Sequence, residues 1–195
     1  MTDPLLIETT DRVLSSVATF EAIEAAEQAR WSSPIWEAVA EIGLPWISVP
    51  EAHGGVGGTI SDAVDVLVQA GRHAAPLPLA ETGLLGGWLL AAAGVDVGDG
   101  PLSVLPGLGD DDLRLEGGRL VGTAHRVPWA SSVERVAGCS TGRSWSAHQQ
   151  RAPSPRSRTW PASLETRSAS TARCPRSSCP PPTASTPRRC GCEGP

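Results

Sequence analysis

The chain has 195 residues and a formal net charge of −5, and it contains no lysine, no tyrosine and one phenylalanine. Residues 1–138 hold 19 acidic residues and seven arginines, whereas residues 139–195 hold two acidic residues and nine arginines. The first twenty residues have no basic segment ahead of an apolar run, and no segment reaches the roughly 20 apolar residues of a membrane helix. We therefore expect a cytoplasmic protein without signal peptide or membrane span, whose character changes after residue 138.

Apolar residues recur at helical spacing in five segments before residue 95. We expect these helices to begin after the cap Asp3, at Phe20, at Ser33, after the cap Thr59 and at Glu81. Thr59 and Asp62 have the spacing of a capping box, with an aspartate in the acidic place. The last segment, residues 81–93, is apolar on most faces, which predicts burial within a bundle or against a partner.

Between the third and fourth helices lies the stretch L-P-W-I-S-V-P-E-A-H-G-G-V-G-G, residues 44–58. Proline has a fixed φ and biases its neighbour toward extended structure, so Pro45 and Pro50 predict an extended segment from Trp46 to Val49. The glycines that follow permit backbone angles that other residues adopt only at a cost. The stretch therefore predicts one extended crossing that ends in a tight turn.

The pattern I-x-V-P-E-x-x-G-G-x-G in this stretch, between two amphipathic helices, resembles the signature of the N-terminal helical domain of acyl-CoA dehydrogenases. The fold that the resemblance implies is mainly α. It is an acyl-CoA dehydrogenase-like N-terminal helical bundle in residues 1–95, followed by an incomplete middle β-domain in residues 96–138. A disordered tail is expected in residues 139–195.

The residues after Pro101 change to strand-like patterns. Residues 102–105 form a short apolar run, and residues 114–121 form two alternating runs joined by two glycines, which predicts a hairpin. The run G-T-A-H-R-V-P-W at residues 122–129 resembles the G-T-K-x-W-I-T strand on which the flavin lies in this family. By that resemblance the candidate FAD-binding residues are His125, Arg126, Val127 and Pro128.

Two departures from the family pattern concern this flavin strand. Arg126, Val127 and Pro128 stand where the family has Trp, Ile and Thr, and Pro128 has no backbone N–H to donate. The T-E-P-G-A-G-S-D segment of the family has no counterpart between Pro101 and Leu113. In both respects the chain is similar to divergent members that work beside a second, more typical subunit.

The tail, residues 139–195, contains one large aliphatic residue, Leu164, among many Arg, Pro, Ser and Thr. Such a composition predicts disorder. A second interpretation is a frameshift, because a GC-rich gene read out of frame yields these residues, and another frame permits strings with apolar alternation. We expect no stable fold for the tail, and therefore a hairpin that lacks the strands it should pair with.

The tail also holds all five cysteines, at positions 139, 174, 179, 190 and 192. No pair has C-x-x-C spacing and partner histidines are absent, so no metal site is expected. Its arginines could bind nucleic acid by charge. Two tryptophans in the tail are too few to indicate base stacking, so we expect neither a nucleic-acid partner nor a membrane.

The reaction of the family removes a proton α to a thioester while hydride passes to the flavin. The family's base lies in a C-terminal domain without a counterpart in this chain, so we assign no catalytic residue. Glu51 and Glu81 are interpreted as solvated or capping acids, and His53 and His73 as structural.

The resemblance implies FAD as cofactor, an acyl-CoA substrate and a second dehydrogenase subunit as partner. The first hypothesis is therefore an FAD-dependent acyl-CoA dehydrogenase, truncated and inactive alone. The alternative is a non-catalytic helical module that pairs with a full-length dehydrogenase subunit.

Overall fold

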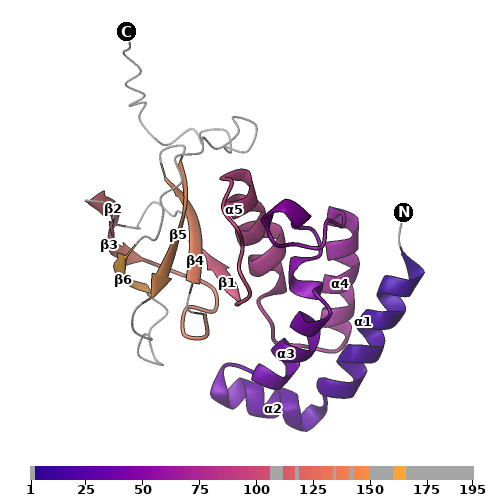
Figure 1. Cartoon of the computed structure of the whole chain (residues 1–195). Coiled ribbons are helices and arrows are strands. Elements are labelled where there is room, and N and C mark those ends of the chain that lie inside the picture. The colour runs from indigo at the N-terminus through magenta and orange to yellow at the C-terminus, as the bar shows by residue number, and fades with distance from the viewer. Residues whose placement is uncertain are drawn as a thin grey trace, which may run out of the picture.

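The computed structural model describes residues 3–105, 112–116, 119–133, 135–140, 143–149 and 160–165. Helices fill the first half and a six-stranded sheet follows, with β1 beside the helices (Figure 1). The helical elements are α1 (Pro4–Val17), α2 (Phe20–Ala29), α3 (Ser33–Glu41), η1 (Leu44–Trp46), η2 (Glu51–His53), α4 (Ile60–Arg72), η3 (Ala80–Gly87) and α5 (Trp88–Ala92). The strands are β1 (Leu102–Val104), β2 (Asp112–Glu116), β3 (Arg119–Ala124), β4 (Arg135–Ser140), β5 (Arg143–Gln149) and β6 (Trp160–Glu165).

Side-chain caps fix where three of the helices begin. The Asp3 carboxylate accepts a hydrogen bond from the Leu5 N–H at 2.9 Å, and the Thr19 hydroxyl caps α2. At α4 the Asp62 carboxylate accepts from the Thr59 N–H at 2.7 Å, and the Thr59 hydroxyl accepts from the Asp62 N–H at 3.2 Å. The predicted capping box is therefore confirmed.

Residues 44–48 form a helical segment and a turn, so the predicted extended segment from Trp46 to Val49 is wrong. Residues 44–46 form the 3-10 helix η1, and Ile47 keeps the helical angles φ −54° and ψ −42°. Pro45 stands in the first turn, where its missing N–H is not needed and its fixed φ suits a helix. Proline restricts its own backbone angles and those of the residue before it, and it leaves the residues after it free to adopt helical angles.

The glycine-rich turn folds back onto this segment through main-chain hydrogen bonds. The Val56 N–H donates to the Trp46 carbonyl at 3.1 Å, and the Gly57 N–H donates to the Val49 carbonyl at 2.8 Å. A Cβ atom on Gly55 would lie 2.1 Å from the Val49 carbonyl oxygen, so only glycine fits there. The tight turn that the sequence predicted is therefore present.

One apolar core joins the helices to the sheet. Its members come from several helices and from two strands. Fully buried members include Leu14, Ile35, Val39, Val49, Val66, Leu90, Val97, Leu102 and Ala137. A second, smaller core contains Ala124, Val127, Ala130, Val133 and Val136. Because strand residues 102 and 137 lie in the first core, the sheet packs directly on the helices.

The helix predicted for residues 81–93 is present, but its first part is a π-helix. This part is η3, and the α-helical turns of α5 follow it. A Cβ atom on Gly83 would lie 2.4 Å from the Pro45 carbonyl oxygen, so glycine lets η3 approach η1 closely. Leu85 is 50% exposed and Trp88 is 42% exposed. Burial within the bundle therefore applies to one side of this helix only.

The sheet has the strand order β1-β4-β5-β6-β3-β2, in which β1 and β4 are parallel and the other pairs antiparallel. The predicted hairpin is confirmed as β2 and β3, with Glu116 opposite Arg119. Strand β3 also pairs with β6 along its whole length. The expectation that the hairpin lacks partner strands is therefore wrong.

Two strands lie within the segment that was expected to have no stable fold. These are β5 and β6, so that expectation does not extend to residues 143–149 and 160–165. Residues 141–142, 150–159 and 166–195 lie outside the described residues. Strand β4 runs across residue 138, at which the sequence placed the end of the β-domain.

Candidate functional site

The four candidate flavin residues lie in a loop and not on a strand. Strand β3 ends at Ala124, and residues 125–133 return to the helices before β4 begins. Arg126 and Trp129 have φ angles of 55° and 53°. These left-handed angles are uncommon for residues other than glycine, so the contacts around the loop must hold them in place.

Each of the four residues has a different environment. Val127 is 5% exposed and packs in the second core. The Pro128 carbonyl accepts a short hydrogen bond from the Ser103 hydroxyl of β1. His125 is half-buried and Arg126 is exposed. The four residues are consecutive in the chain, but their side chains do not face one common point.

A second hydrogen bond joins the loop to the helices, whereas the first joins it to β1. The Ser132 hydroxyl donates to the Arg30 carbonyl, at the end of α2, at 2.7 Å. Within the loop, the Ser132 N–H donates to the Trp129 carbonyl at 2.8 Å and closes a turn. Arg30, the C-terminal cap of α2, has a left-handed backbone with φ 62°.

Glu81 of η3 meets this loop, and its environment differs in part from the sequence interpretation. Glu81 was interpreted as a solvated or capping acid; it is half-buried, and it stands in the first turn of η3, which agrees with the capping alternative. Burial raises the pKa of the Glu81 carboxyl above its usual value, although hydrogen bonds from its own backbone N–H and from the Trp129 side chain lower it in part. Sequence reasoning missed this contact, because no local pattern links residue 81 to residue 129.

Thr82, the next residue of η3, contacts the edge of the sheet. It is fully buried. Its hydroxyl accepts a hydrogen bond from the Leu102 N–H at 3.1 Å and donates to the Leu102 carbonyl at 3.3 Å. The π-helix thus directs two neighbouring polar side chains to the seam between the helices and the sheet, one toward β1 and one toward the loop.

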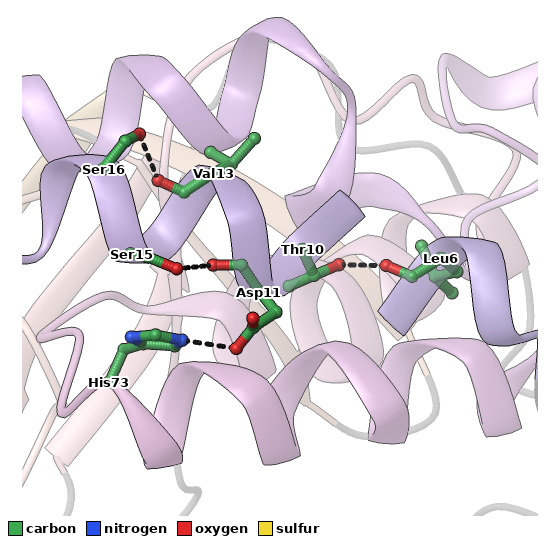
Figure 2. A network of polar contacts seen from close by, with 7 residues as sticks. All are labelled: Leu6, Thr10, Asp11, Val13, Ser15, Ser16 and His73. Atoms are coloured by element: carbon green, nitrogen blue, oxygen red, sulfur yellow. Dashed lines mark hydrogen bonds and ion pairs between the residues drawn. The ribbon is translucent and has the colours of Figure 1, made fainter. Parts of the chain in front are cut away.

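A separate polar cluster joins α1 to the end of α4 (Figure 2). His73 Nε2 lies 2.9 Å from Asp11 Oδ1. In α1 the Thr10 hydroxyl donates to the Leu6 carbonyl at 2.8 Å, one turn back along the helix. His53 Nδ1 lies 3.6 Å from Asp96 Oδ1. The two histidines therefore connect segments that are far apart in sequence, as a structural role requires.

Beside this cluster, α1 and α4 border an open hollow of about 420 Å³. Its lining residues are Pro4, Ile7, Glu8, Asp11, Gln69 and Arg72. Among the described residues, no group of three or more His, Cys, Asp and Glu side chains could hold a metal ion. In the same part of the chain, no helix combines the length and apolarity needed to cross a membrane.

Comparison with known proteins identifies the helical part. Residues 4–96 match the family model described as acyl-CoA dehydrogenase, N-terminal domain. The chain contains an acyl-CoA dehydrogenase N-terminal domain. No curated protein matches the sequence.

Solved structures share this acyl-CoA dehydrogenase architecture. The ChsE4-ChsE5 complex from Mycobacterium tuberculosis is 21% identical with a TM-score of 0.60, over 76% of this chain and 48% of that chain. The Tcur3481-Tcur3483 steroid ACAD is 26% identical with a TM-score of 0.57, over 73% of this chain and 46% of that chain. A putative acyl-CoA dehydrogenase from Mycobacterium smegmatis is 16% identical with a TM-score of 0.59, over 90% and 57%. The chain thus spans about half the length of these structures.

Acyl-CoA dehydrogenases use a flavin, and the loop residues fit such a group poorly. A flavin ring takes hydrogen bonds from protein donors to its ring atoms. Pro128 offers no N–H, and its carbonyl is already paired with Ser103. Val127 is turned into the second core. Two of the four residues that the resemblance assigned to FAD therefore lack the chemistry for it.

Proposed function

We propose that this chain is one component of an FAD-dependent acyl-CoA dehydrogenase, an enzyme that forms a double bond between the α and β carbons of an acyl-CoA thioester. The match of residues 4–96 to the N-terminal domain of that family carries the proposal. The order of elements agrees with it, since a helical domain is followed by strands.

The reaction needs a base for the α proton, a flavin for the β hydride, and donors that polarise the thioester carbonyl. By family resemblance the base lies in the C-terminal domain of the relatives, which has no counterpart in residues 1–195. We therefore expect residues 1–195 alone to be inactive, and we propose that turnover requires a complex with a second dehydrogenase subunit.

Two observations support assembly with a second subunit. Two of the similar structures, ChsE4-ChsE5 and Tcur3481-Tcur3483, are each named for two proteins. In addition, Leu85 and Trp88 are exposed on the helix formed by η3 and α5, whose other side is buried. The same exposure favours the second candidate function, a non-catalytic helical module that only stabilises a full-length dehydrogenase.

Dye-reduction assays with a series of acyl-CoA thioesters test these functions. The purified chain alone is expected to give no turnover above the no-enzyme control. Co-expression with a full-length acyl-CoA dehydrogenase subunit is expected to give a complex with turnover that neither chain has alone. A complex whose turnover equals that of the full-length subunit would establish the non-catalytic module. Turnover by the isolated chain would overturn the proposed division of labour.

A further inference from the structure

We infer that residues 125–133 form a latch that fastens the sheet to the helices at the place where the family resemblance puts the flavin, and that this chain holds no FAD there. The inference goes beyond the proposed function, because it concerns what this loop does within the isolated chain. It rests on the hydrogen bonds, the burial and the backbone angles of the loop.

Two side-chain hydrogen bonds and one side-chain contact join the latch to three different elements. The Ser103 hydroxyl of β1 donates to the Pro128 carbonyl. The Trp129 side chain lies against the Glu81 carboxylate of η3 and lowers its pKa in part. The Ser132 hydroxyl donates to the Arg30 carbonyl at the end of α2. Because these partners lie far apart in sequence, the latch ties together segments that local structure cannot connect.

The apolar side chains of the latch face inward between these hydrogen bonds. Val127, Ala130 and Val133 are 4–5% exposed, at every third residue along the loop. They pack with Ala124 and Val136, which end β3 and lie in β4. The loop therefore covers the second core with its own side chains, which is the place of a packed segment and not of a ligand platform.

The donors that a flavin would need are already used within the protein. The hydroxyls of Ser103 and Ser132 donate to main-chain carbonyls, and the Trp129 side chain is paired with a carboxylate. Releasing any of them to a flavin would leave its present acceptor without that bond, at a free-energy cost where the acceptor is buried. The left-handed angles of Arg126 and Trp129 persist because these contacts hold them.

The flavin part of the inference is tested by titrating the purified full chain with FAD. The expected result is no co-purified flavin, no quenching of FAD fluorescence and no rise in Tm. Binding of one FAD per chain would overturn the inference. It would leave the proposed function intact, because that function depends on turnover in a complex and not on which chain holds the flavin.

The latch part is tested by limited trypsin cleavage after Arg126, read by mass spectrometry. Ser132→Ala removes one hydroxyl, and Trp129→Phe removes the indole N–H while keeping an aromatic ring. Loss of one hydrogen bond, about 1 kcal/mol, corresponds to about fivefold more open loop and hence about fivefold faster cleavage. Glu81→Gln keeps an acceptor oxygen, so it is expected to change the cleavage rate least.

Ser131→Ala is the matched control, because it removes the neighbouring hydroxyl from the same turn. Far-UV circular dichroism verifies that each variant keeps its helices. If Ser132→Ala and Trp129→Phe are cleaved no faster than Ser131→Ala, the loop is not held by these bonds and the latch is disproved.

Discussion

The carboxyl group of Glu81 makes the stability of the whole chain depend on pH. Its folded-state pKa is raised, chiefly by burial, so the folded chain retains a proton at pH values where the unfolded chain has released it. The contribution of this group to stability is therefore fully present below the unfolded pKa. It falls as the pH rises through the folded pKa, because the buried carboxyl must then ionise.

We predict that Glu81→Gln gains stability relative to the wild type as the pH rises from about 4 to about 7, since an amide does not ionise. Urea unfolding at both pH values measures the difference.

Glu21→Gln is the control of opposite sign. Hydrogen bonds from its own backbone N–H and from the Thr19 side chain lower the pKa of Glu21. Its contribution to stability is lost as the pH falls, so Glu21→Gln should compare worse with wild type at about pH 7. Parallel trends for the two variants would contradict this assignment.

At residue scale, sequence patterns predicted caps well and tertiary contacts poorly. The Thr59 and Asp62 box is a local interaction over three residues, and the structure contains it. Glu81 and Trp129 lie 48 positions apart, and no spacing rule connects them. The interpretation of Glu81 as a solvated acid failed for that reason. The assignment of His125–Pro128 to FAD rested on a strand pattern, whereas the chain turns out of β3 at that place.

The π-helix η3 depends on glycine for its close approach to η1. A Cβ on Gly83 would lie 2.4 Å from the Pro45 carbonyl oxygen, which is main chain and cannot rotate away. In contrast, a Cβ on Gly71 of α4 would meet nothing within 4 Å. The two glycines therefore separate the effect of packing from the effect of helix propensity.

We predict that Gly83→Ala destabilises the chain by roughly 1–3 kcal/mol, because η3 must move away from η1. Gly71→Ala is expected to stabilise it by about 0.5–1 kcal/mol, since alanine has the higher helix propensity. Chemical denaturation of both variants gives the comparison. Equal effects would mean that η3 does not pack as described.

Helix α4 shows why amphipathic spacing located an element but not its buried face. Val64 and Val68 also fall at helical spacing in this helix, yet they are 46% and 52% exposed. The residues that enter the core are Ala63, Val66 and Ala70. Apolar residues cover more of this helix than one core needs, so periodicity alone could not select the side. The orientation follows from contacts with α1 and η3, which only the folded chain provides.

On the scale of the whole molecule, the helices depend on residues from beyond the helical segments. Val97 and Leu102 are fully buried in the same core as Leu14 and Val39. The boundary that the sequence placed at residue 95 leaves both outside the helical domain. Helix positions were predictable because caps and spacing are local. The pairing of β1 with β4 was not, because strand partners far apart in sequence leave no local pattern.

We predict that a chain ending at residue 95 melts at least ~5 °C below a chain ending at residue 140, since each lost core side chain removes about 1.5–3 kcal/mol. Thermal unfolding followed by circular dichroism measures this. A chain ending at residue 105 retains Val97 and Leu102, so it should recover part of the difference. Equal Tm values for the chains ending at 95 and 140 would show that the helices fold independently of the strands.

The hydrogen bonds of Thr82 have a consequence for how the protein behaves in concentrated solution. Strand β1 is one border of the sheet, and the Thr82 hydroxyl occupies the outward N–H and carbonyl of Leu102. The other border is β2, whose sequence D-L-R-L-E places a charge at every second position. A strand from a neighbouring molecule would therefore displace a buried side chain at one border or approach a row of charges at the other. The helical half thus protects the β1 border of the sheet from templated, fibre-like growth.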